Sequence, residues 1–170
     1  MKYVKYFKAV VSIVILVAFD QLTKWLAVKY LLPGGPISII DGVFELRYLE
    51  NRGAAFGIFQ NRQWMFILLT LIIVAAVIWL YIKMPETKRM LPLRIISVAV
   101  ISGAIGNLID RILNSYVVDF LYFRLIDFPI FNVADIYVTV SAVIFIILFI
   151  FYYKDDDFKF LNRKEKAAHE

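Results

Sequence analysis

Long apolar stretches, each bounded by polar and charged residues, alternate along this chain. A helix needs about 20 mostly apolar residues to cross a bilayer. The pattern predicts four such helices, at residues 7–30, 64–82, 93–113 and 133–153. The third is the least apolar, but its small residues recur at a spacing that lets helices pack closely in lipid. We therefore expect an all-α polytopic membrane protein in which residues 1–170 form a single integral membrane domain.

The segment between the first two predicted spans has the pattern of a small β-structure. Pro33-Gly34-Gly35-Pro36 should end the first helix. Two strand-like runs, 37–40 and 43–49, flank the turn dipeptide Asp41-Gly42. Apolar and polar residues alternate in the second run, as they do in a half-buried strand. We expect an extracytoplasmic β-hairpin, or cradle, that lies on the membrane face and covers a site beneath it.

Charge then orients the predicted spans. The chain is 62% hydrophobic and 19% charged, with a net charge of +5. Its basic residues concentrate at the N-terminus, in 83–92 and in the C-terminal tail, which the positive-inside rule places in the cytoplasm. Segments 31–63 and 114–132 are then extracytoplasmic, although arginines in 31–63 make this bias imperfect. The N-terminus resembles a secretory signal without a small-x-small cleavage site, so we interpret it as an uncleaved first span.

Composition also excludes several kinds of chemistry. The chain has no cysteine, and its one histidine, His169, lies in the polar tail. A thiol nucleophile, a disulfide and a thiolate metal site are therefore impossible, and neither a Ser-His-Asp triad nor a histidine zinc site is expected. We expect no cofactor. The positive charge indicates membrane lipids as partners rather than nucleic acid, for which no motif is present.

Carboxylates from three of the predicted spans converge near the outer membrane interface. A helix rises ~1.5 Å per residue, so Asp20 and Asp110 lie beyond the midplane of a ~30 Å core when counted from the cytoplasmic side. Asp119 follows the third span, and Asp135 begins the fourth. Acids are costly within a membrane, so their convergence predicts a functional site.

Asp119 and Asp135 are the candidate catalytic pair. Two close carboxyls cannot both ionise easily and should share one proton. The ionised member can take a proton from an attacking water, while the protonated member polarises a peptide carbonyl and protonates the leaving nitrogen. Asn132 is an expected N-cap, so we expect Asp135, at a helix N-terminus, to be ionised and Asp119 to hold the proton. The spacing leaves an alternative open, in which Asp135 is a first-turn helix acid and Asp119 a loop acid.

The remaining polar residues favour structural roles around this pair. Asp20 and Lys24 are four residues apart in the favourable acid-first order, which predicts an ion pair that braces the site. We interpret Asp110 and Arg111 chiefly as ion-paired members of a buried network at the end of the third span. Asn51 lies in a stretch rich in small residues, where it either hydrogen-bonds a substrate backbone or forms a turn.

Five sequence blocks, in this order, carry a resemblance to a known family: Asp20-Gln21-Leu22-Thr23-Lys24, Asn51-Arg52-Gly53-Ala54-Ala55-Phe56, Gly106-Asn107-Leu108-Ile109-Asp110-Arg111, Val117-Val118-Asp119-Phe120 and Phe128-Pro129-Ile130-Phe131-Asn132-Val133-Ala134-Asp135. Over nearly its whole length the chain resembles bacterial lipoprotein signal peptidase, also called signal peptidase II, a family of intramembrane aspartic peptidases. The resemblance implies an endopeptidase of the bacterial cell membrane with its active site towards the outer leaflet. Its substrates would be prolipoproteins carrying a diacylglyceryl cysteine, cut just before that cysteine, and globomycin-type peptides would inhibit it.

The resemblance also assigns roles to single residues. Asp119 and Asp135 match the family's catalytic aspartates. The residues that match polar groups supporting the dyad or holding the substrate backbone are Asn51, Asn107, Arg111 and Asn132. The remaining supporting positions are Asp20, Lys24 and Asp110.

Two other classes of function are compatible with acids inside a membrane. One is a small transporter or proton-coupled carrier, because intramembrane acids also relay ions. The predicted spans offer no acidic path across the bilayer, which disfavours it. The other is a non-enzymatic assembly subunit, which would need the polar residues only for packing. Loss of function from conservative changes at Asp119 and Asp135, with folding intact, separates an enzyme from both.

Overall fold

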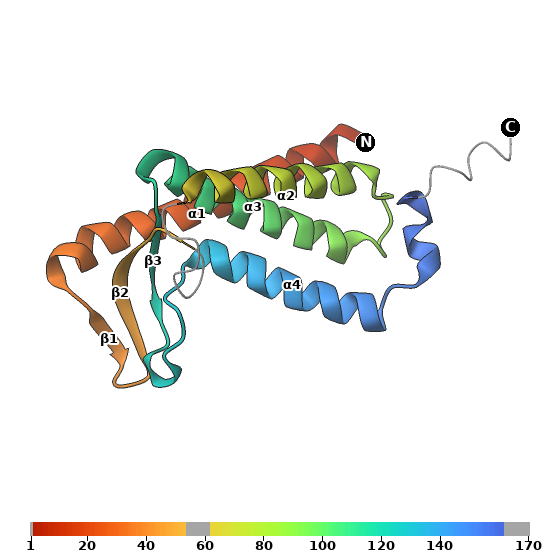
Figure 1. Cartoon of the computed structure of the whole chain (residues 1–170). Coiled ribbons are helices and arrows are strands. Elements are labelled where there is room, and N and C mark those ends of the chain that lie inside the picture. Colours follow the sequence, from red (N-terminus) through yellow and green to blue (C-terminus); the bar gives the residue numbers. More distant parts are fainter. Residues whose placement is uncertain (1, 54–61, 162–170) are drawn as a thin grey trace, which may run out of the picture.

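The computed structural model describes residues 2–53 and 62–161 of the chain. Within these ranges, long helices lie side by side, and a small sheet crosses one end of them (Figure 1). The long helices are α1 (Lys2–Gly34), α2 (Gln63–Lys83), α3 (Leu91–Asn114) and α4 (Val133–Phe151). Each falls at a predicted span, and α1 is longer than expected at both ends, because it begins at Lys2 and continues through Pro33 to Gly34. It ends there because Gly35 has a positive φ of 78°, which favours glycine.

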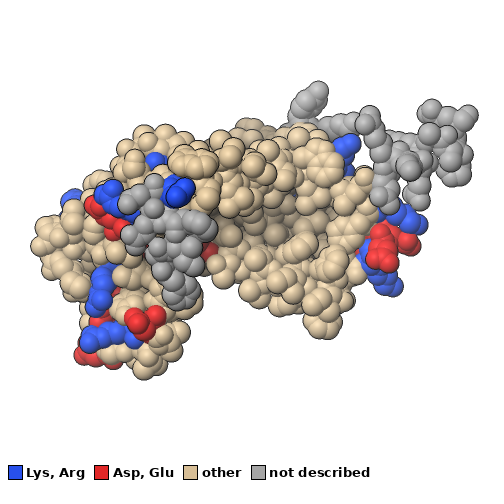
Figure 2. All heavy atoms as spheres, in the orientation of Figure 1, with Lys and Arg blue, Asp and Glu red and all other residues tan. Residues whose placement is uncertain are grey.

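The surface of the helices is apolar, as lipid requires. Helix α2 contains no buried residue. Its large apolar side chains, such as Leu68, Ile72 and Ile82, are exposed on the surface. Figure 2 shows charged side chains gathered at both ends of the visible face, with a broad uncharged region between them. Within the described ranges, four helices are long and apolar enough to cross a bilayer. The chain is therefore a multi-pass membrane protein.

The described strands form one three-stranded antiparallel sheet in the order β1-β2-β3. Strands β1 (Ile37–Ile40) and β2 (Phe44–Asn51) form a hairpin at the predicted turn, where Gly42 has a φ of 72°. Strand β3 (Val117–Tyr122) comes directly after α3 and was not predicted from the sequence. It pairs with β2 so that Leu49 lies opposite Asp119. The predicted hairpin is thus joined by a third strand, β3, which carries the predicted catalytic residue Asp119.

One face of the sheet packs on the end of α1. Val118 and Phe120 of β3 are buried there against Ala27 and Leu31 of α1, with Leu46 of β2 beside them. Burial of apolar area is the main stabilising contribution to such a contact. It fixes the sheet across the end of the helices and leaves its other face to line a cavity.

Glycines allow α3 to approach its neighbours closely. A Cβ atom at Gly103 would lie 2.5 Å from the carbonyl oxygen of Ala134, and one at Gly106 would lie 2.5 Å from the Asp20 carboxylate. Both glycines belong to the small-residue pattern noted in the third span. Their missing side chains bring α1, α3 and the start of α4 together beneath the sheet.

The opposite end of the helices has its own core. Met84, Met90 and Leu93 are buried there with Tyr153, which follows α4. A short 3-10 helix, η3 (Asp155–Leu161), lies beside them, and Arg89 binds Asp157 at 2.7 Å. A further 3-10 turn, η2 (Arg124–Ile126), follows β3 at the sheet end.

Candidate active site

Asp119 and Asp135 line the same cavity. Asp119 lies in β3, and Asp135 lies in the first turn of α4. The cavity has a volume of about 1030 Å³, and Asn51 and Arg111 also line it. Strand β3 and helix α4 are therefore the elements that bring the two predicted catalytic carboxyls together.

Asparagine side chains hold the Asp119 carboxylate from both sides. Asn51 donates from Nδ2 to Oδ2 at 2.8 Å, and Asn132 donates from Nδ2 to Oδ1 at 2.6 Å. Asp119 is only 1% exposed. Burial and the nearby charge of Asp135 raise the pKa of Asp119 to about 7, although both asparagine bonds act in the opposite direction. A carboxyl with this pKa holds its proton through much of the physiological pH range.

Asp135 combines a capping role with a place in the cavity wall. Its Oδ2 accepts from the backbone N–H of Asn132 at 3.1 Å, and its own N–H donates to the Asn132 side chain at 3.0 Å. This reciprocal pair is a capping box that satisfies free donors at the start of α4. Its Oδ1 accepts from Asn107 Nδ2 at 2.8 Å. Asp135 is therefore a first-turn helix acid, as the structural alternative predicted. That role does not explain why its carboxyl also lines the cavity with Asp119.

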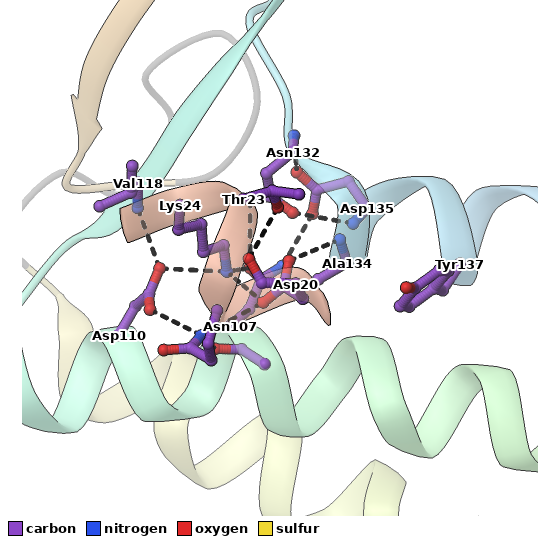
Figure 3. A network of polar contacts seen from close by, with 12 residues as sticks. Asp20, Thr23, Lys24, Asn107, Asp110, Val118, Asn132, Ala134, Asp135 and Tyr137 are labelled. Carbon is purple, nitrogen blue, oxygen red and sulfur yellow. Dashed lines mark hydrogen bonds and ion pairs between the residues drawn. The ribbon is translucent and has the colours of Figure 1, made fainter. Parts of the chain in front are cut away.

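The amides of Asn132 and Asn107 connect the two carboxyls. Asn132 Nδ2 donates to Asn107 Oδ1 at 3.1 Å as well as to Asp119. Asn107 Oδ1 also accepts from Lys24 Nζ at 2.8 Å (Figure 3). With its oxygen facing these donors, Asn107 must present its NH₂ group to Asp135. The orientation of each amide is thus set by its neighbours.

The predicted ion pair between Asp20 and Lys24 is confirmed, with Nζ 2.9 Å from Oδ2. Lys24 also lies 3.1 Å from Asp110. Gln21, which the sequence analysis did not single out, donates to Asp110 Oδ1 at 3.1 Å and to Gly106 O at 3.1 Å. Its signal was its own polarity, because an amide inside a membrane span is costly unless it is hydrogen-bonded.

The expected ion pairing of Arg111 is wrong within the described part of the chain. Lys24 of α1 satisfies Asp110 instead, and no carboxylate in residues 2–53 or 62–161 forms an ion pair with Arg111. The Arg111 guanidinium lies 5.1 Å from the ring centre of Phe66 and lines the cavity. It donates weakly to the carbonyl of Asn107 at 3.4 Å. Arg111 therefore presents a charged donor to the cavity.

Asn51 takes part in a turn and also contacts Asp119. Its Oδ1 accepts from the backbone N–H of Gly53 at 3.0 Å, which is the local bond of a turn. Its Nδ2 donates to Asp119, a contact consistent with the dyad-supporting role that the resemblance implied for Asn51. The rest of its sequence block, 54–56, lies outside the described residues.

The far part of the cavity is lined by residues that the sequence analysis did not place in a site. Arg47 of β2 stacks on Tyr122 of β3 at 4.8 Å from the ring centre, and both line the cavity. Along α4, the lining residues are Ile136, Thr139 and Val140. The cavity thus extends from the polar sheet to the apolar surface of a membrane helix.

Membrane-spanning helices and a cavity lined by two carboxyls define an integral membrane protein with an aspartate-lined site. Comparison with known proteins identifies its family. The family model described as signal peptidase (SPase) II matches residues 12–151. The chain belongs to the signal peptidase II family.

Relatives named lipoprotein signal peptidase are similar to most of this chain. A lipoprotein signal peptidase of Caldanaerobacter subterraneus is 44% identical over 144 residues, which are 84% of this chain and 96% of the relative. One from Streptococcus pyogenes is 38% identical over 149 residues, covering 88% of this chain and 95% of the relative. The residues matched by the family model, 12–151, span all five site blocks.

Two solved structures, each described as a bacterial membrane enzyme structure by the in meso method, share the fold. The one at 2.3 Å resolution has a TM-score of 0.72 and 29% identity, and covers 84% of this chain and 87% of its own. The one at 1.9 Å resolution has a TM-score of 0.74 and 30% identity, and covers 86% of this chain and 94% of its own.

Proposed function

We propose that this chain is a membrane aspartic endopeptidase that removes the signal peptide from diacylglyceryl-modified prolipoproteins by cleaving before the lipidated cysteine. Membership of the signal peptidase II family supports this reaction. The observation that carries the proposal is the common cavity of Asp119 and Asp135, where asparagines hold each carboxyl. We propose these two aspartates as the catalytic dyad.

The two carboxyls have different environments, which suits the two halves of the reaction. The pKa of Asp119 is about 7, so Asp119 supplies the proton. Asp135 sits at the positive end of α4, where negative charge is favoured, so it serves as the base. Asp135 takes a proton from water, and the water oxygen bonds to the scissile carbonyl carbon. The protonated Asp119 carboxyl polarises the carbonyl oxygen, and the C–N bond then breaks as Asp119 gives its proton to the leaving nitrogen. The enzyme forms no covalent intermediate in this scheme.

Other members of the site support the dyad or hold substrate. Asn107 and Asn132 orient the carboxyls, and Asn51 donates to Asp119. Arg111 offers its guanidinium to the cavity, where it can donate to a substrate carbonyl. The buried ion pairs of Lys24 with Asp20 and Asp110 stabilise the helices that carry these side chains.

We place the sheet on the outer face of the bacterial cytoplasmic membrane, with 31–63 and 114–132 extracytoplasmic. The N-terminus, 83–92 and the C-terminal tail then lie in the cytoplasm, as their basic residues favour. A lipid-bearing substrate would enter sideways along α4, because the cavity reaches Ile136 and Val140 on that helix. The hairpin would cover the peptide and limit the access of water. Membrane lipids and globomycin-type inhibitors are the other expected partners.

Purified protein in detergent or lipid tests the proposed reaction. A diacylglyceryl-modified prolipoprotein should shift on a gel to the mature form, and mass spectrometry should place the new N-terminus at the lipidated cysteine. The same prolipoprotein without diacylglycerol is the matched control and should be a poor substrate. Globomycin should block the shift. Absence of cleavage by folded protein, or equal cleavage with and without the lipid, would contradict the proposal.

A further inference from the structure

Asp20, Lys24 and Asp110 form a buried ion triad next to the proposed dyad. Their exposed fractions are 0%, 3% and 3%, and Lys24 Nζ lies 2.9 Å from Asp20 and 3.1 Å from Asp110 (Figure 3). Asp20 and Lys24 come from α1, whereas Asp110 comes from α3. A single ammonium between two carboxylates leaves one negative charge in excess. Such a charge is costly in a buried site unless further donors satisfy it.

The further donors come from the backbone beside the proposed dyad. Asp20 Oδ1 accepts from the N–H of Ala134 at 2.9 Å, and Ala134 directly precedes Asp135. Asp110 Oδ2 accepts from the N–H of Val118 at 3.1 Å, and Val118 directly precedes Asp119. Each carboxylate of the triad therefore holds the main chain one residue before a proposed catalytic aspartate.

We propose that the Asp20–Lys24–Asp110 triad is a spacer that fixes the separation and relative orientation of the two catalytic carboxyls. Asp119 and Asp135 belong to different elements, β3 and α4, which are linked by residues 123–132, including the 3-10 turn η2. The triad joins both elements through a common ammonium, so neither backbone can shift alone. Lys24 also fixes the Asn107 amide that donates to Asp135. These residues are positioning residues, because they do not reach the cavity that holds the dyad.

This role predicts an effect on chemistry rather than on substrate binding. Catalytic groups must be held within a fraction of an ångström of their working geometry, and the residues behind them supply that constraint. Movement of about 1 Å at the dyad can lower turnover by about 100-fold. It would also change the coupling between the carboxyls, and hence the separation of the two apparent pKa values in the pH–rate profile. A triad that served packing alone would lower the amount of folded enzyme and leave both properties of that enzyme unchanged.

Two substitutions at Asp20 test whether the site needs the hydrogen-bond acceptor of this side chain or its negative charge. Asp20→Asn retains an oxygen that can accept from Ala134, and it leaves Lys24 with Asp110 as a balanced ion pair. Asp20→Ala removes the acceptor. We expect kcat to fall between about 10- and 100-fold in Asp20→Ala, with KM changed less than about threefold. Asp20→Asn should recover at least about a third of the wild-type kcat. Asp110→Ala and Asp110→Asn should behave in the same way.

Ser97→Ala is the matched control, because Ser97 is buried in α3 and donates to the Leu93 carbonyl, away from the dyad. Wild-type kcat and an unchanged pH profile in folded Asp20→Ala and Asp110→Ala would overturn the spacer. If the alanine variants do not fold, the asparagine variants decide: a folded Asp20→Asn enzyme with kcat reduced more than about 100-fold contradicts a role that needs only an acceptor. The inference rests on the proposed function, but its failure is distinct, because wild-type protein that does not cleave prolipoprotein would contradict the function itself.

Discussion

The side chain of Asn132 donates a hydrogen bond of 2.6 Å to Oδ1 of Asp119, which lies in a different element. The same side chain accepts from the N–H of Asp135 and so caps α4. One asparagine therefore combines a structural task with a direct contact to each half of the proposed dyad. Loss of its Oδ1, which caps α4, should lower stability, and loss of its Nδ2, which donates to Asp119, should lower turnover.

Two substitutions at Asn132 distinguish these tasks. Asn132→Ser keeps a capping oxygen but loses the amide that donates to Asp119, whereas Asn132→Ala loses both. We expect Asn132→Ala to lower the free energy of unfolding by about 0.5–2 kcal/mol and Asn132→Ser to lower it less. Turnover should fall at least about tenfold in both, since a donor to a carboxylate is lost in each. Thermal unfolding and kcat of the same preparations measure the two effects. Full activity in Asn132→Ser would show that the amide bond to Asp119 is dispensable.

Activity should depend on pH through Asp119. Its pKa of about 7 means that Asp119 loses its proton as the pH rises through neutrality. The proposed reaction needs that proton, so kcat/KM should fall on the alkaline side with an apparent pKa near this value. Asn51 donates to Asp119 and favours its ionised form, so Asn51→Ala should move the alkaline limb to higher pH. Rates measured from pH 5 to pH 9 test both statements, and a flat profile up to pH 9 would contradict them.

The same shift predicts a pH-dependent stability. The folded state holds the Asp119 proton up to about pH 7, whereas the unfolded chain loses it near the usual value of 3.8. The folded state therefore binds more protons between these values, and stability falls as the pH rises through this window. Asp119→Asn removes this contribution. Its midpoint of thermal unfolding should exceed that of the wild type at pH 8, and the difference should shrink towards pH 4. A constant difference across this range would contradict the raised pKa.

Close packing of α3 and α4 should be sensitive to one methyl group. In Gly103→Ala the added Cβ would lie 2.5 Å from the Ala134 carbonyl oxygen and 2.9 Å from Val138 Cγ2. Because one of these atoms is backbone, the helices must separate, and we expect a loss of about 1–3 kcal/mol in stability. Turnover should also fall, because Ala134 precedes Asp135. Gly34→Ala is the matched control, since nothing lies within 4 Å of its added Cβ. Equal stability of the two variants would refute the close contact.

Local sequence patterns were sufficient for much of this fold. Each predicted span corresponds to a helix, and the hairpin turns at Asp41-Gly42. The Asp20–Lys24 pair was predictable too, because residues four apart share a helix face. These features depend on periodicity or on neighbours in the same element, which a single sequence displays directly.

The missed features depend on contacts between distant segments. Strand β3 pairs with β2 about seventy residues earlier, as in the pair Leu49 and Asp119, and its β-branched and aromatic residues did not reveal a partner. Within the described residues the expected ion pairing of Arg111 was wrong, and Lys24 of α1 lies against the neighbouring Asp110 instead. The sequence indicated that Asp119 and Asp135 approach each other, but the asparagines that connect them depend on the packing of α3, β3 and α4.

The central claim is that Asp119 and Asp135 together cleave the prolipoprotein, and single replacement of each by asparagine tests it most directly. Asp156→Asn is the matched control, because Asp156 is exposed at the opposite end of the molecule. Cleavage of diacylglyceryl-modified prolipoprotein should be lost in folded Asp119→Asn and Asp135→Asn, and it should stay at the wild-type rate in Asp156→Asn. Near-normal turnover in either dyad variant would contradict the account.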